Sequence, residues 1–136
     1  MSYNIFISHS WDYSDAYQKL VLLLDKARYF SYRNYSVPKD DPLIIRSSAY
    51  YRAELKAKIK RQMIFCNAVL VLAGVYASYS DSINLEIEAA RELGKPIIAV
   101  EPWGSEKTST VVKQSARVIV GWNTDSIVNA IRYYSI

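Results

Sequence analysis

The sequence predicts an α/β fold in which an open parallel β-sheet is covered by helices on both faces. Short apolar runs alternate along the chain with segments of helical periodicity. Residues 67–73 (NAVLVLA) and 96–100 (PIIAV) are apolar almost without interruption, which is typical of central parallel strands buried on both faces. The composition is that of an ordinary globular protein, with 51% hydrophobic and 22% charged residues. At this chain length we expect a single domain that spans residues 1–136.

The amino-terminal half contains two predicted helices and one or two strands. Residues 3–7 (YNIFI) form a β-rich run, and the segment 12–28 carries apolar side chains at helical spacing. Residues 30–37 are aromatic and polar, which indicates a short edge strand or an irregular segment. A loop marked by two prolines comes next. Residues 48–62 then predict a helix with apolar side chains on one side and basic ones on the other.

The carboxy-terminal half continues the alternation of strands and helices. Gly94 and Pro96 end one predicted helix, because glycine favours the position after a helix and proline cannot continue one. The predicted elements, in chain order, are a strand at 67–73, a polar loop at 74–81, a helix at 82–93, a strand at 96–100, a loop at 101–110, a strand at 117–120 and a helix at 125–134.

Five strands separated by helices favour the flavodoxin-like strand order 2-1-3-4-5. Ligands of such sheets bind beyond the carboxyl ends of the strands, near the switch point between strands 1 and 3. This rule predicts a site formed by the residues after the first strand, the loop after Gly74 and the start of the helix at 82–93. The residues expected after the first strand are Ser8, His9, Ser10 and Trp11.

One carboxylate is out of place in the helix predicted at 82–93. Wound at about 100° per residue, this segment forms an apolar arc opposite a polar face. Glu86 falls in the middle of the apolar arc, flanked by Ile83 and Ala90. A carboxylate that faces a core is costly unless it is paired or hydrogen-bonded. Glu86 is therefore expected to serve either a structural salt bridge or the chemistry of the site.

Composition and motifs exclude several classes of function. No apolar run reaches the ~20 residues of a membrane span, and a single cysteine, Cys66, fits a reducing cytoplasm. We expect no membrane association and a cytoplasmic location. The net charge is +4, but the basic residues gather on the helix at 48–62 without a recognisable nucleic-acid-binding motif. No nucleic-acid partner is therefore expected. With one histidine in the chain, no His/Cys pair has metal-ligand spacing, so no metal is predicted.

The sequence lacks the motifs of other protein families that share this fold but carry out different chemistry. The segment after the first strand lacks the acidic pair of a response-regulator receiver and the phosphate loop of a flavodoxin. GxGxxG and Walker A motifs are absent. A Ser-His-Asp triad would need Ser8 or Ser10 beside His9, and adjacent residues of one loop rarely take those positions.

One carboxylate is sufficient for cleaving the nicotinamide–ribose bond of NAD. Ordinary glycosidases need two carboxyl groups because the leaving alcohol must be protonated. The nicotinamide of NAD is already a cation and leaves as a neutral molecule. A single ionised Glu86 can hold the ribose and stabilise the oxocarbenium-like transition state, and a helix N-terminus nearby favours the ionised form. Trp11, Tyr35 and Trp103 are candidates to stack on the rings of such a substrate, beside their packing roles.

Five segments of the chain resemble the Toll/interleukin-1 receptor (TIR) domain family, and more closely its bacterial branch of Thoeris antiphage proteins. Residues 5–10 (IFISHS) resemble the TIR first-strand motif, and Glu86 lies in the segment that resembles the one carrying the TIR catalytic glutamate. Enzymatic members often have a Trp four residues before this glutamate, where this chain has Ser82. The Glu86 segment continues through 94–98 (GKPII), and the remaining matching segments are 35–38 (YSVP) with 41–43 (DPL), 102–104 (PWG) and 120–123 (VGWN).

The resemblance implies a NAD-cleaving enzyme, of the NAD glycohydrolase or ADP-ribosyl cyclase type, in antiphage immunity. Glu86 would be catalytic, and the substrate would be bound by Ser8, His9, Ser10, Trp11, Tyr35 and Ser36. NAD would be the substrate, with no further cofactor. The product would be an ADP-ribose-derived nucleotide, such as a cyclic ADP-ribose, that passes a signal to a separate effector protein. Self-association and a phage-derived trigger are further expectations.

Two alternatives remain open from the sequence. The chain could be a non-catalytic TIR scaffold that acts by protein–protein assembly, with Glu86 paired to an arginine or to backbone amides. It could also resemble a nucleoside deoxyribosyltransferase, which uses a glutamate on a related sheet.

Overall fold

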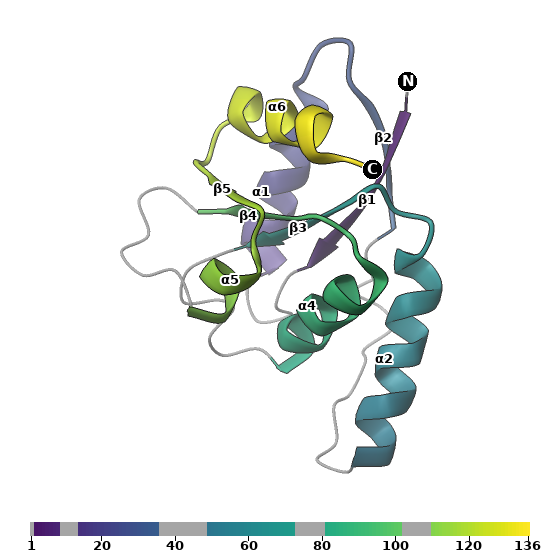
Figure 1. Ribbon diagram of the computed structural model, residues 1–136. Helices are drawn as coiled ribbons and strands as arrows, with labels where there is room; N and C mark the ends of the chain where they lie inside the picture. The colour runs from purple at the N-terminus through teal and green to yellow at the C-terminus, as the bar shows by residue number, and fades with distance from the viewer. Residues whose placement is uncertain (1, 9–13, 36–48, 73–80, 102–109) are drawn as a thin grey trace.

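The computed structural model describes residues 2–8, 14–35, 49–72, 81–101 and 110–136. It has one five-stranded sheet in the order β2-β1-β3-β4-β5, and all four strand pairs are parallel. This confirms the predicted α/β, flavodoxin-like fold. Figure 1 shows the sheet between two helical layers, with α1 and α6 on one side and α2, α4 and α5 on the other.

The strands occupy the segments where the sequence is most apolar. The two central strands, β3 and β4, are buried along their whole length because helices cover both of their faces. The edge strand β2 is short and mostly exposed. The strands are β1 (Ser2–Ser8), β2 (Ser31–Asn34), β3 (Ala68–Leu72), β4 (Ile97–Val100) and β5 (Val118–Val120).

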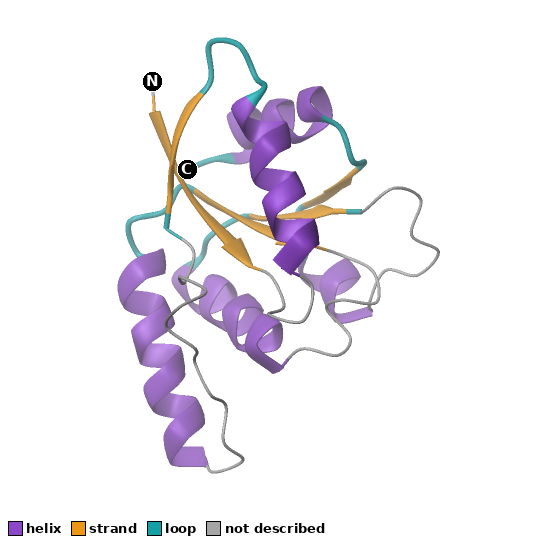
Figure 2. Cartoon of the chain, turned by 180° about the vertical axis from the view of Figure 1, so that it is seen from behind, coloured by secondary structure: helices purple, strands orange, loops and turns teal. Residues whose placement is uncertain are grey.

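The helices follow the predicted amphipathic segments, with one addition. The short helix α5 is absent from the sequence prediction, which assigns no element to residues 111–116. The helices are α1 (Ser14–Asp25), α2 (Ala49–Met63), α4 (Asp81–Leu93), α5 (Thr110–Ser115) and α6 (Thr124–Tyr134). Figure 2 shows the same two layers from behind. None of the helices in the described segments is long and apolar enough to cross a bilayer.

Two hydrophobic cores form because side chains alternate between the faces of each strand. Ile5 and Ile7 of β1 belong to the core beneath α1 and α6. Phe6 lies between them in sequence and belongs to the core beneath α2, α4 and α5. The residue after Ile7 should therefore face the same layer as Phe6, and that residue is Ser8.

Candidate active site

Ser8 is the last residue of β1, at the carboxyl edge of the sheet. It pairs in register with Val71 of β3, which belongs to the core beneath α4. Strand alternation turns the Ser8 side chain toward this same layer. Its side chain is fully buried, with 0% exposure. The sequence prediction that Ser8 lies at the carboxyl end of the first strand is confirmed.

Glu86 lies on the buried side of α4, as its helical periodicity predicts. Ile83, Ala89 and Ala90, which are three or four residues away along the helix, are all fully buried. Glu86 itself is 5% exposed. Apart from Ser8, it is the buried residue with a polar side chain in the described part of the chain. A carboxyl group has thus been placed in a largely apolar layer.

Burial raises the pKa of the Glu86 carboxyl from 4.5 to about 8, because the charged form loses its hydration. The Ser8 hydroxyl acts on the carboxylate as a hydrogen-bond donor and lowers the pKa, but this effect is the smaller one. The expected help from the helix N-terminus does not keep the pKa low. Glu86 is the sixth residue of α4, beyond the first four positions whose N–H groups are free.

The interaction between Ser8 and Glu86 is incomplete. The Ser8 hydroxyl is near enough to stabilise the charge, yet Ser8 Oγ and Glu86 Oε2 both lack a well-formed hydrogen bond in the structure. Buried polar atoms of this kind are uncommon in folded proteins and call for an explanation, such as a role in binding or catalysis. The two atoms lie where the topology rule for open α/β sheets predicts a ligand.

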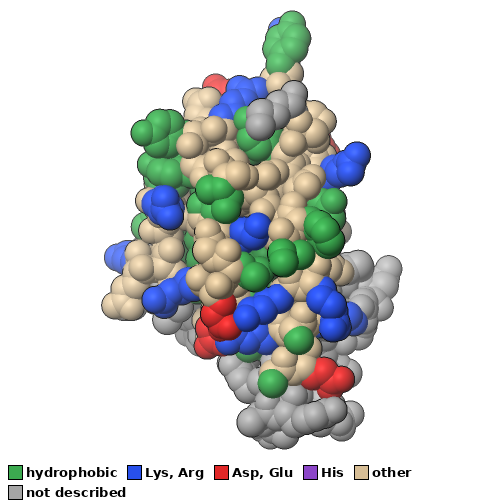
Figure 3. Space-filling model, turned by 45° about the vertical axis from the view of Figure 1, so that its right-hand side comes forward, with side chains coloured by type: hydrophobic (Ala, Val, Ile, Leu, Met, Phe, Trp, Pro, Cys, Tyr) green, Lys and Arg blue, Asp and Glu red, His purple; other side chains and the backbone are tan. Residues whose placement is uncertain are grey.

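A structural salt bridge does not account for Glu86. Within the described segments, no charged side chain contributes to its pKa. The acidic residues of α4 that form ion pairs are Glu88 and Glu92, on the exposed side of the helix. They pair with Lys56 and Lys60 of α2, with Lys60 Nζ 2.6 Å from Glu92 Oε1. Figure 3 shows acidic and basic side chains side by side in the lower part of the face that brings α2 forward.

The structure brings Ser8 and Glu86 together, whereas the described contacts of Tyr35 are with Ile5 and Phe65. Tyr35 follows β2, and its backbone N–H donates to the Ile5 carbonyl at 2.8 Å. Its half-buried ring stacks on Phe65, with ring centroids 6.3 Å apart. Binding of substrate by Tyr35 stays a prediction. The other predicted site residues lie outside the described residues: His9, Ser10, Trp11 and Ser36, together with Trp103.

The described residues offer no competing nucleophile or metal site. Cys66 is buried, and burial raises its thiol pKa to about 12, so the reactive thiolate is disfavoured at neutral pH. Within the described segments, no group of three or more His, Cys, Asp or Glu side chains is placed to hold a metal ion.

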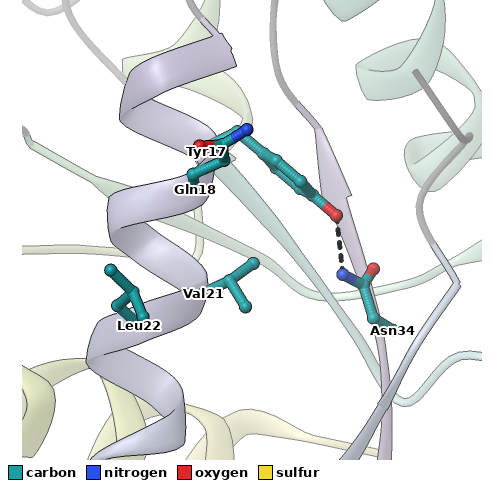
Figure 4. Close-up of a pocket in the computed structure, with 5 residues that line it drawn as sticks. All are labelled: Tyr17, Gln18, Val21, Leu22 and Asn34. Atoms are coloured by element: carbon teal, nitrogen blue, oxygen red, sulfur yellow. Dashed lines mark hydrogen bonds between the residues drawn. The ribbon is translucent and has the colours of Figure 1, made fainter.

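Two hollows in the described surface lie away from Glu86. One, of about 300 Å³, lies between α1 and β2 and is lined by Tyr17, Gln18, Val21, Leu22 and Asn34. In Figure 4 Asn34 Nδ2 donates to the Tyr17 hydroxyl across this hollow, at 2.7 Å. The other, of about 530 Å³, is lined by Lys60, Arg61, Ile64, Phe65 and Leu93. Neither contains a buried ionisable group of the kind found at Glu86.

Comparison with solved structures supports the fold. The chain is similar to a 2-deoxyribosyltransferase from Bacillus psychrosaccharolyticus, with a TM-score of 0.57 and 16% identity over 93% of this chain and 90% of that one. It is also similar to the Clostridium botulinum CMP N-glycosidase BcmB, with a TM-score of 0.54 and 13% identity over 95% of this chain and 98% of that one. At such identities the likeness shows a shared fold.

Sequence comparison identifies the family. A comparison with curated proteins gives no significant match. The family model described as "Thoeris protein ThsB, TIR-like domain" matches residues 6–107, which is most of the chain and includes both Ser8 and Glu86. The chain therefore belongs to the family of Thoeris ThsB proteins with a TIR-like domain.

Proposed function

We propose that this protein cleaves the nicotinamide–ribose bond of NAD, with Glu86 as the catalytic carboxylate. The observation that carries the proposal is a buried carboxyl group with an unsatisfied oxygen at the ligand-binding edge of the sheet. Family membership points to the same residue, because Glu86 lies in the segment that resembles the one carrying the TIR catalytic glutamate.

The reaction requires no general acid. The bond between ribose C1′ and the nicotinamide nitrogen breaks, and the electron pair leaves with neutral nicotinamide. Positive charge then develops on the ribose, where the ionised Glu86 stabilises it in a poorly hydrated site. Water capture of the ribosyl cation gives ADP-ribose and a proton. Capture by a nucleophile of the same substrate gives a cyclic product.

Binding of the substrate's cationic nicotinamide ring would also counter the raised pKa of Glu86. With a pKa of about 8, most Glu86 is neutral at pH 7 in the free protein. A cation placed beside the carboxyl group favours its ionised form. NAD therefore promotes the charge state that its own cleavage requires.

The family context supports a signalling role. As a ThsB-family protein, this chain is proposed to act in Thoeris antiphage defence. The ADP-ribose-derived product would carry the signal to a separate effector protein after a phage-derived trigger and self-association. His9, Ser10, Trp11, Tyr35 and Ser36 are proposed to complete the substrate pocket beside Glu86.

The two solved structures of similar fold are named as a 2-deoxyribosyltransferase and a CMP N-glycosidase, and such enzymes act on N-glycosidic bonds. This supports bond cleavage at a ribose anomeric carbon as the reaction class. It also favours a second candidate, the transfer or hydrolysis of nucleosides and nucleotides. A neutral nucleobase needs protonation to leave, so the neutral form of Glu86 present at pH 7 would suit that reaction.

The test is to incubate the purified protein with NAD, with and without phage lysate as the trigger, and to measure free nicotinamide. Glu86→Gln is expected to lower release by at least about 100-fold, the scale set by loss of one key electrostatic group. Glu88→Gln, an exposed carboxylate on the same helix, is the matched control and should retain wild-type activity.

Three outcomes distinguish the candidates. Release that survives Glu86→Gln would remove the assigned role. Turnover of deoxynucleosides or CMP in place of NAD would favour the second candidate. Absence of turnover with every substrate and trigger would favour a scaffold that acts by assembly.

A further inference from the structure

Ser8 and Glu86 form an isolated polar pair inside an apolar layer. They are the buried polar and charged residues among the described side chains, with exposures of 0% and 5%. They come from different elements, β1 and α4, that are far apart in sequence. Each has an oxygen without a well-formed hydrogen bond.

The position of Ser8 suits contact with Glu86 better than contact with a substrate. Ser8 ends β1 on the face that bears Phe6, so its hydroxyl lies beneath α4. A fully buried hydroxyl presents no surface to an incoming ligand, whereas Glu86 as a residue is 5% exposed. Ser8 is therefore better placed to contact Glu86 than to contact a substrate.

We propose that Ser8 is a positioning residue, whose hydroxyl donates to Glu86 once the carboxylate is ionised and so holds the other oxygen toward the ribose. This inference rests on the proposed NAD-cleaving function. A hydroxyl suits the task because it rotates and can either donate or accept. It can therefore adjust to either form of the carboxyl group, and it donates to the carboxylate in the substrate complex. The present loose contact is expected, since catalytic hydrogen bonds often tighten only when substrate is bound.

Within the described segments, no charged side chain contributes to the Glu86 pKa, so Ser8 is the described residue that can position the carboxylate. On α2, Lys56 and Lys60 are engaged with Glu88 and Glu92. The exposed Lys113 of α5 and Arg91 of α4 itself make no contribution to the Glu86 pKa. Phe6 of β1 and Val69 and Val71 of β3 contribute apolar side chains to this layer. Asn4, on the same face of β1, donates to the Phe65 carbonyl. Ser8 is the described residue that lowers the Glu86 pKa.

Ser8→Ala removes the donor and should raise the Glu86 pKa further. Two measurements test this: the pH profile of NAD cleavage, and titration of the Glu86 carboxyl by ¹³C NMR without substrate. We expect the acid limb of kcat/KM to move to higher pH and activity near pH 7 to fall about tenfold, as a shift of one pKa unit requires. Activity well above the limb should recover toward that of the wild type.

Two variants serve as controls. Ser8→Thr keeps the hydroxyl and should restore the wild-type profile. Ser31→Ala, at an exposed serine of the neighbouring strand β2, should leave it unchanged. If Ser8→Ala left both the acid limb and the NMR titration where they are in the wild type, the positioning role would be wrong.

The other possible results of these experiments can be told apart. A raised KM with an unmoved acid limb would make Ser8 a direct substrate contact. If the wild type failed to cleave NAD, the proposed function would fall, but the NMR titration would still decide whether Ser8 controls the ionisation of Glu86. If Ser8→Ala did not fold, the NMR titration of Ser8→Thr against Ser8→Cys, which has a weaker donor, would carry the same test.

Discussion

At the scale of single residues, the protein carries a destabilising feature that the proposed reaction would use. A carboxyl group with a pKa of about 8 is held in an apolar layer by a helix whose neighbouring side chains are buried. Its ionisation is therefore costly in the free protein at neutral pH. Ser8, at the end of β1, supplies the one described polar side chain that eases this ionisation.

The raised pKa of Glu86 predicts that the protein loses stability as the pH rises. The native state binds a proton at Glu86 that the unfolded state releases above its pKa of about 4.5. The stabilisation is thus complete below pH 4.5 and is lost as the pH rises through about 8. Between pH 5.5 and 8.5 we expect the free energy of unfolding to fall by a few kcal/mol, on the order set by linkage.

Urea denaturation across this pH range checks the prediction, with Glu86→Gln as the comparison. The variant has no titrating group at this position, so its stability should depend much less on pH. The range ends at pH 8.5 because ionisation of Cys66, whose pKa is also raised, begins to contribute above it. Equal pH slopes for both proteins would show that the Glu86 pKa is not raised in the folded state.

At the scale of elements, each helix owes its position to local sequence features as well as packing. Helix α6 is the clearest case. Asn123 is its N-cap and accepts a hydrogen bond from the Ser126 backbone N–H at 2.8 Å. Asp125 in the first turn and Arg132 in the last turn complement the helix dipole. The segment at 120–123 that resembles the Thoeris family thus has a structural role at its last residue.

Removing this cap should destabilise the protein without altering the site. Asn123→Ala leaves the Ser126 N–H without its partner and is expected to cost about 1 kcal/mol. Asn129→Ala, at an exposed position within the same helix, is the control and should be neutral or slightly stabilising because alanine is the better helix former. Thermal unfolding of both variants measures the difference. A loss no larger than the control's would show that the cap is unimportant.

At the scale of the whole molecule, one asparagine joins segments from both ends of the chain. The Asn67 backbone N–H donates to the Asn4 carbonyl and its side-chain oxygen accepts from the Asn4 N–H, both at 2.7 Å. Asn67 Nδ2 donates to the Ile136 carbonyl at 2.8 Å, and its backbone carbonyl accepts from the Ile136 N–H. Asn67 therefore links three segments by hydrogen bonds: the amino-terminal strand, the start of the central strand and the chain end, which are shown in Figure 2.

Loss of this junction is expected to destabilise the fold as a whole. Asn67→Ala removes two side-chain hydrogen bonds and should cost about 2 kcal/mol, at roughly 1 kcal/mol for each bond. Asn67→Asp keeps the acceptor for Asn4 but places a charged acceptor oxygen against the Ile136 oxygen, so it should cost at least as much as the alanine variant. Urea denaturation of the two variants orders them. The reverse order would place the main contribution at the acceptor for Asn4.

The sequence by itself determined the class of fold and the burial of the Glu86 carboxyl group. Strands β3 and β4 follow from apolar runs, and the position of Glu86 follows from the period of its helix, because both depend on neighbours along the chain. Helix α5 was missed, since six residues with two β-branched valines give no usable period. The short edge strand β2 stayed ambiguous for a similar reason, because an exposed edge needs no alternating pattern.

Only the tertiary structure decided how Glu86 is surrounded. The pairing of Ser8 with Glu86 joins β1 to α4 through the sheet topology, and no local pattern specifies such a contact. The direction of the Glu86 pKa likewise depends on the balance between lost hydration and nearby dipoles in three dimensions. The helix N-terminus suggested an ionised group, whereas burial in the layer formed by α2, α4 and α5 outweighs that effect and raises the pKa of the Glu86 carboxyl.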